Sequence, residues 1–296
     1  MRNRIYFHIG LQKTATTTLQ VDIFPVIPNV KFMGRNAKAA VNHELYHDLC
    51  RYCFSIDKDD ELKLKISKKI EVELSKNDLL FSEEWFCTDY DNIHKGSGAC
   101  WQHKLRSLGE CLSGFDYDII LSSRKPIDAL FSVYCQNLQR YKPIEYGTFQ
   151  QFYLNSNDAK AYNSEYLKEV VNSELGERKK IHEIKFEDIN DLELINKSLC
   201  NIFGLNSYYV KKISNNNINK SYKKNTVTIK KDTVYVNFVR KISVFIPENI
   251  KNWIKRKFSI NVNSLVGEFR KPEIINRPTQ SDIDSIKKMY GETNAY

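Results

Sequence analysis

A lysine and a cluster of hydroxyl side chains follow the first glycine of the chain. Lys13 lies three residues after Gly10, and the five residues after that lysine are Thr14, Ala15, Thr16, Thr17 and Thr18. Threonine is favoured at the start of a helix, where its hydroxyl accepts from N–H groups that lack a helical partner. The same N–H groups attract an anion, and a lysine adds a full positive charge. We therefore predict an anion-binding turn here, against the alternative of a basic surface turn.

The elements on either side of this turn must aim its N–H groups. Residues 5–9, IYFHI, are apolar, aromatic and β-branched, which predicts a buried strand. A helix is predicted from Thr16 to about residue 26, where Pro25 and Pro28 end it. Strand, glycine turn and helix together place the helix N-terminus beyond the end of the strand.

Two further predicted strands also end in charged side chains. Residues 78–82 run into Glu83 and Glu84, and residues 117–123 run into Arg124. Strand patterns alternate with helical ones, which predicts an α/β fold with a parallel sheet covered by helices on both faces. Ligands bind such sheets beyond the carboxyl ends of the strands. These charged side chains are therefore expected to meet the anion-binding turn.

The composition and charge divide the chain unevenly. Of its 296 residues 42% are hydrophobic and 12% aromatic, which suits a globular core. Residues 1–205 are predicted to form the α/β core, and residues 206–296 a basic, mainly helical C-terminal segment packed on it. The net charge of +9 arises in residues 211–257, which hold thirteen Lys or Arg and two acidic residues. An exposed loop is expected around 220–231 and a short helix from Pro247.

The anion-binding turn does not match a Walker A loop. That loop needs two glycines five residues apart with a lysine directly after the second, whereas Lys13 follows Gly10 by three residues and no second glycine is present. Residues 8–20, HIGLQKTATTTLQ, instead resemble the 5′-phosphosulfate loop of the sulfotransferases that use 3′-phosphoadenylyl sulfate (PAPS), especially the bacterial and carbohydrate-directed branches. Residues 124–134, RKPIDALFSVY, resemble the 3′-phosphate motif of that family.

The resemblance implies a fold and a reaction. The fold is a P-loop NTPase-like three-layer sandwich with a central parallel sheet. The reaction transfers the sulfuryl group of PAPS to a hydroxyl, here expected to belong to a carbohydrate of a cell-surface or lipid-linked glycan. The product is adenosine 3′,5′-bisphosphate (PAP), and no metal takes part.

The resemblance also implies roles for individual residues. Lys13 would lie near the bridging oxygen and stabilise the departing phosphate. Arg124, and Ser132 eight residues later, would hold the 3′-phosphate. The 5′-phosphosulfate would be held by backbone N–H groups of Thr14, Ala15, Thr16, Thr17 and Thr18, with hydroxyl contacts from Thr17 and Thr18. Ala15 replaces a glycine of many family members, and alanine still allows close approach of the backbone if its φ is negative.

Attack by a hydroxyl requires a base within hydrogen-bond reach. The glycan-directed branch has a glutamate in the region of Glu83 and Glu84, and adjacent residues of an extended chain point opposite ways. Only one of the two can then face the site, and Glu83 is the preferred candidate. His8, on the first strand, and His103, on a predicted helix, are weaker candidates.

A metal site is not expected. His43, His47, Cys50 and Cys53 fall on one face of a predicted helix, but ten residues of helix rise ~15 Å, which is too far for one tetrahedral ion. The seven scattered cysteines suit reduced thiols. Since no signal-peptide pattern and no apolar run of ~20 residues is present, a cytoplasmic location is expected.

Several alternatives stay open. The basic segment 211–257 is a solvated surface, a contact for cofactor phosphates or an anionic glycan, or a region whose helix from Pro247 lies on an anionic membrane leaflet. The chain as a whole is alternatively a P-loop small-molecule kinase or a non-catalytic nucleotide-binding protein on the same fold. Nucleic-acid binding is not expected, since no recognised module is present.

Overall fold

A computed structural model describes most of the chain. The described residues are 3–34, 44–89, 99–138, 146–176, 179–213, 226–231 and 271–290. None of the helices in these ranges is long and apolar enough to cross a membrane.

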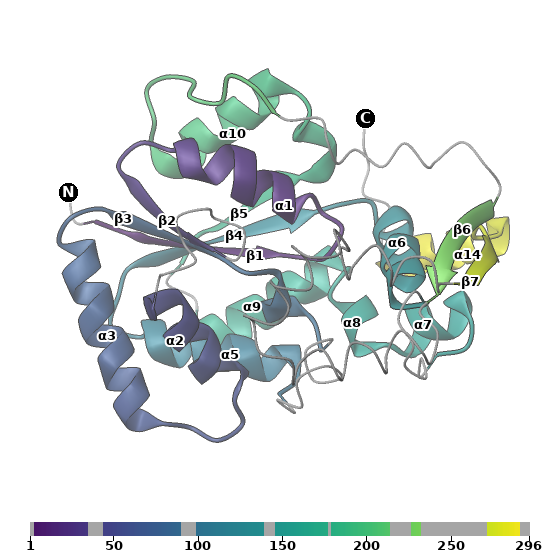
Figure 1. The fold of residues 1–296 in the computed structure, drawn as a ribbon, viewed down its shortest axis with the longest axis horizontal. Coiled ribbons are helices and arrows are strands. Elements are labelled where there is room, and N and C mark those ends of the chain that lie inside the picture. Colours follow the sequence, from purple (N-terminus) through teal and green to yellow (C-terminus); the bar gives the residue numbers. More distant parts are fainter. Residues whose placement is uncertain are drawn as a thin grey trace, which may run out of the picture.

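A five-stranded parallel sheet lies at the centre, in the order β2-β3-β1-β4-β5 (Figure 1). Its strands are β1 (Ile5–Gly10), β2 (Val30–Gly34), β3 (Asp78–Ser82), β4 (Tyr117–Ser123) and β5 (Ile181–Lys185). The predicted α/β fold with a parallel sheet is confirmed, and β2 and β5 are its two edge strands. All six residues of β1 are buried, as expected for a central strand covered on both faces.

Helices cover both faces of the sheet, which gives three layers (Figure 1). One face carries α10 (Leu192–Phe203) and a continuous helical segment after β1 that consists of α1 (Thr16–Thr18), a π-helical part η1 (Leu19–Ile23) and a 3₁₀ part η2 (Phe24–Val26). The opposite face carries α2 (Glu44–Phe54), α3 (Asp60–Leu74), α5 (Trp101–Leu112) and α9 (Ser164–Leu175). The remaining described helices of the core are η4 (Glu84–Cys87), α6 (Pro126–Leu138), α7 (Phe149–Asn155), α8 (Asn157–Lys160) and η5 (Phe186–Asp188).

The strand pleat separates two apolar cores. Tyr6 of β1 packs with Leu19 on the side of α1 and α10, whereas Phe7 packs with Ile66 of α3 on the other side. Neighbouring residues of a strand point to opposite faces, so alternate apolar side chains feed both cores. The alternation places the side chains of Tyr6 and His8 on the face of the sheet that is covered by the segment beginning at Thr16.

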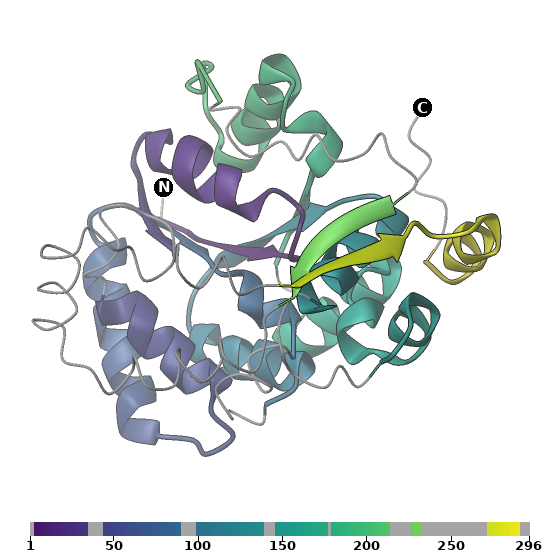
Figure 2. The same ribbon diagram turned by 45° about the vertical axis from the view of Figure 1, so that its right-hand side comes forward.

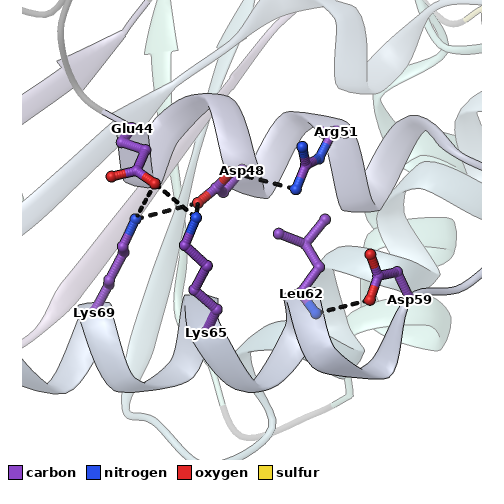
Figure 3. A network of polar contacts seen from close by, with 7 residues as sticks. All are labelled: Glu44, Asp48, Arg51, Asp59, Leu62, Lys65 and Lys69. Atoms are coloured by element: carbon purple, nitrogen blue, oxygen red, sulfur yellow. Dashed lines mark hydrogen bonds and ion pairs between the residues drawn. The ribbon is translucent and has the colours of Figure 1, made fainter.

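Ion pairs join α2 to α3 on the outer layer (Figure 3). The ammonium of Lys65 lies 2.6 Å from Glu44 and 3.1 Å from Asp48, and that of Lys69 lies 2.8 Å and 3.2 Å from the same two carboxylates. Asp59 caps α3 by accepting from the N–H three residues later, at 2.9 Å. The lysines and Glu44 are partly or largely exposed, so each pair contributes little free energy. Asp48 is buried, however, and the four-membered network joins the two helices.

The C-terminal segment differs in part from its prediction. Residues 226–231, expected as loop, form strand β6 (Thr226–Lys231), which pairs antiparallel with β7 (Lys271–Asn276). Figure 2 shows this ribbon beside the helices that follow β4. The last helix, α14 (Gln280–Tyr290), packs on the core, with the Tyr290 hydroxyl donating to the Tyr153 carbonyl at 2.6 Å. The helix predicted from Pro247 and most of the basic segment lie outside the described residues.

Candidate functional site

Three chain segments converge where neighbouring strands β3, β1 and β4 end. The Thr16 hydroxyl donates to Glu84 Oε2 at 2.9 Å, which joins the turn after β1 to the segment after β3. Arg124 Nη1 donates to the carbonyl of Lys13 at 3.0 Å, which joins the same turn to the segment after β4. The predicted convergence of the turn, the acidic pair and the arginine is therefore confirmed.

The turn after β1 is wound so tightly that Gly10 is required. A Cβ on this residue would come within 2.1 Å of the Thr16 side-chain methyl group. Lys13 has a φ of 66° and Ala15 a φ of 59°, with the residue between them outside this left-handed region. Such alternation turns successive backbone N–H groups toward one point and creates an anion-binding concavity.

Ala15 does not meet the condition of a negative φ. Its φ is 59° and its ψ is 27°. A side chain in this region costs about 1–2 kcal/mol, which explains why glycine would suit the position. The chain maintains the turn without glycine, because Leu19 N–H donates to the Ala15 carbonyl at 3.1 Å and starts the following helix.

The threonine hydroxyls of the turn serve different partners. Thr14 is fully buried, donates to the Leu11 carbonyl at 2.6 Å and lies 2.6 Å from Ser122 Oγ. Its hydroxyl thus stabilises the turn from within, and only its N–H is suited to a ligand. Thr16 is also buried and donates to Glu84, whereas Thr17 is exposed and Thr18 is half-buried. Of the four threonines of the turn, only Thr17 and Thr18 are not buried.

A buried polar cluster supports the turn from below. His8 Nδ1 lies 2.7 Å from Ser82 Oγ, and Gln20 Nε2 donates to the same oxygen at 2.9 Å. Burial lowers the pKa of His8 to about 3, so the imidazole is neutral. Within the described residues its Nε2 has no hydrogen-bond partner. His8 is thus a fully buried strand residue that packs against Phe24.

The two adjacent glutamates point in different directions, as predicted, but the preference for Glu83 is reversed. Glu83 is only 3% exposed; it accepts from the Tyr46 hydroxyl and, at 3.1 Å, from the N–H of Trp85. These bonds make it a structural cap of η4. Glu84 is half-buried and its carboxylate meets Thr16 at the anion-binding turn. Glu84 is therefore the carboxylate that faces the site.

Arg124 lies between the turn and an aromatic ring. Besides its bond to the Lys13 carbonyl, its guanidinium carbon lies 4.2 Å from the centroid of the Phe186 ring. The next residue, Lys125, donates its N–H to Glu187 at 3.3 Å. Ser132 lies in the second turn of α6, half-buried, and within the described residues its hydroxyl makes no hydrogen bond.

Three aromatic residues at the candidate site are not predicted from the sequence: Tyr46, Tyr162 and Phe186. The Tyr162 hydroxyl donates to the Gln12 carbonyl at 2.8 Å in the interior, and burial raises the pKa of this phenol. Burial likewise raises the pKa of Tyr46, which holds Glu83. The two tyrosines carry no local sequence signal, since they reach the site only through folding. Phe186 directly follows β5, just as Arg124 directly follows β4, so its place at a strand end is the signal that points to it.

The remaining candidates lie elsewhere. His103 Nε2 lies 3.1 Å from the Ser55 carbonyl, on the outer helical layer. Cys53 is buried in the core, and burial raises the pKa of its thiol. The described ranges contain no group of three or more side chains that could hold a metal ion, and His43 lies outside them.

A search against models of known protein families and a search of curated proteins found no match for this chain. The evidence for a function therefore comes from residues 8–20 and 124–134 and from the geometry of the candidate site.

Proposed function

We propose that this protein is a sulfotransferase that uses PAPS, with a carbohydrate hydroxyl as the acceptor. One observation carries the proposal: the guanidinium of Arg124 bonds at 3.0 Å to the carbonyl of Lys13. This bond joins Arg124, which is expected to bind the 3′-phosphate, to the turn that is expected to bind the 5′-phosphosulfate. Residues 8–20 and 124–134, which resemble the two PAPS motifs, supply these groups.

The geometry of the turn fits the phosphosulfate end of that donor. The alternating φ values at Lys13 and Ala15 turn N–H groups toward one point, and a helix begins at Thr16. The lysine adds a positive charge beside the bond that breaks. The strand order, with β1 between β3 and β4, supports a P-loop NTPase-like variant of the α/β fold.

Glu84 is proposed as the base in place of Glu83. When bound, PAPS supplies an activated sulfuryl group attached to a phosphate. Glu84 takes the proton of the acceptor hydroxyl while that oxygen bonds to sulfur, and the bond from sulfur to the bridging oxygen breaks. Lys13 stabilises the charge that develops on the bridging oxygen, and PAP leaves. Arg124 and Ser132 hold the 3′-phosphate throughout.

Thermal unfolding with two nucleotides tests the proposal. PAP at about 100 times its Kd should stabilise the protein by about 2.7 kcal/mol, which raises the Tm by several degrees. ATP with Mg²⁺ should do less, since it has no 3′-phosphate for Arg124. Stabilisation by ATP with Mg²⁺ alone would instead identify a kinase.

Turnover separates an enzyme from a binding protein. If PAP binds, PAPS should be converted to PAP when a set of oligosaccharides is supplied as acceptors. Binding of PAP without conversion by any acceptor would support the non-catalytic alternative.

A further inference from the structure

One phenylalanine at the edge of the site belongs to neither apolar core. Every other phenylalanine in the described ranges lies in one of the two cores or packs against it. Phe186 instead begins η5 directly after β5 and is half-buried. Core formation therefore does not explain an aromatic residue at this position.

The sheet itself brings Phe186 to Arg124. Ser123, the last residue of β4, pairs with Lys185, the last residue of β5. Arg124 and Phe186 directly follow these two residues and so lie side by side. The guanidinium carbon lies 4.2 Å from the ring centroid, which is within the range of a cation–π interaction. The bond from Lys125 N–H to Glu187 ties the same two chain segments together one residue further on.

Arg124 is consequently held from two directions. The ring of Phe186 lies against one side of its guanidinium, and the carbonyl of Lys13 accepts from Nη1 at 3.0 Å. An arginine side chain loses much rotamer freedom when it binds a ligand. Restricting it beforehand lowers that entropic loss and so strengthens binding.

We infer that Phe186 is a positioning residue that holds Arg124 toward the 3′-phosphate and thereby makes the site select nucleotides that carry this phosphate. This inference rests on the proposed function. It extends that function by naming a residue that acts through Arg124.

Calorimetric titration with two nucleotides tests the inference without any acceptor. The titrations use PAP and adenosine 5′-phosphate, which lacks the 3′-phosphate. The Phe186→Leu variant should bind PAP roughly three- to tenfold more weakly, in keeping with a cation–π contact, and adenosine 5′-phosphate as the unchanged protein does. The Phe186→Tyr variant keeps the ring and should bind PAP normally. Phe115→Leu, a half-buried phenylalanine remote from the site, is the matched control.

A second substitution shows whether the ring acts through the arginine. In an Arg124→Gln background, Phe186→Leu should weaken PAP binding no further. The inference is wrong if the two substitutions weaken PAP binding independently, or if Phe186→Leu weakens the binding of PAP and adenosine 5′-phosphate equally. The ring would then act on the nucleotide directly. If leucine lowers the Tm by more than a few degrees, Phe186→Met gives the same comparison with a larger apolar side chain. If the unchanged protein binds PAP and Phe186→Leu has no effect, only this inference fails; if it binds no PAP, the proposed function fails with it.

Discussion

The Thr16 hydroxyl donates to the Glu84 carboxylate at 2.9 Å across 68 residues of sequence. This bond joins the first residue of the helix after β1 to the first residue of η4 after β3. Since Thr16 belongs to the anion-binding turn, the proposed base is fixed relative to the group it must serve. Thr16, which is expected to offer its backbone N–H to the cofactor, thus also orients a carboxylate through its hydroxyl.

Substitution of the two glutamates should separate catalysis from stability. Glu84→Gln keeps the size of the side chain but cannot accept a proton, so conversion of PAPS should fall by about 10²–10⁴-fold, with PAP affinity nearly unchanged. Glu83→Gln should retain more activity but lower the free energy of unfolding by about 1–3 kcal/mol, because it disturbs a buried hydrogen-bonded group. Turnover and urea denaturation measure the two effects. If Glu83→Gln instead abolished turnover and Glu84→Gln did not, Glu83 would be the base.

A methyl group added to the turn should be destabilising. Gly10→Ala would place its Cβ 2.1 Å from the Thr16 methyl group, and overpacking of this kind costs about 1–3 kcal/mol. The Gly10→Ala, Thr16→Ser double variant removes that methyl group and keeps the hydroxyl that bonds Glu84. It should recover part of the lost free energy, though not all, since Ser122 Oγ would lie 3.1 Å from the same Cβ. Additive losses in the double variant would contradict the close approach.

Glycine should be tolerated at Ala15 but not in a helix. Ala15→Gly removes the strain of a side chain at a φ of 59°, but glycine loses more backbone entropy on folding than alanine does. The first effect is the larger here, so the free energy of unfolding should rise by up to about 1 kcal/mol. Ala129→Gly, in the interior of α6, serves as control and should lower it by about 1 kcal/mol or more. Denaturant titration of both variants checks this. A loss at Ala15 equal to that at Ala129 would mean that the left-handed conformation is not populated.

The buried imidazole of His8 should make stability depend on pH. Its pKa is lowered to about 3 in the folded protein, so the unfolded chain binds more protons between about pH 6.5 and 3. The free energy of unfolding should therefore decrease as the pH falls through this range, by up to about 1.4 kcal/mol per pH unit. Burial raises the pKa of Asp158 to about 6, which acts in the opposite direction.

A His8→Gln variant isolates the contribution of the histidine. Asp158 is unchanged in it, so the difference between the two proteins removes the opposing effect. The variant should lose less free energy of unfolding between pH 7 and 5 than the unchanged protein. Parallel pH profiles for the two would show that His8 is not the responsible group.

The sequence alone determined three strands of the central sheet, β1, β3 and β4, and the edge of that sheet at which the candidate site lies. Apolar runs such as residues 5–9 and 117–121 locate strands because burial on both faces leaves a local pattern. The charged residues that follow these runs share one edge because parallel strands all end there. Lys13, Arg124 and the acidic pair could therefore be assigned to one site before any contact was known.

Only the tertiary structure showed that Glu84, and not Glu83, meets the turn, and only it brought Tyr46 and Phe186 to the candidate site. These outcomes depend on contacts between residues far apart in the chain, such as the bonds of Tyr46 to Glu83 and of Thr16 to Glu84. The positive φ of Ala15 likewise runs against the local preference of alanine for a negative φ. Local preferences carry no information on such contacts, because each side chain acquires its partner only when separate strands are brought together.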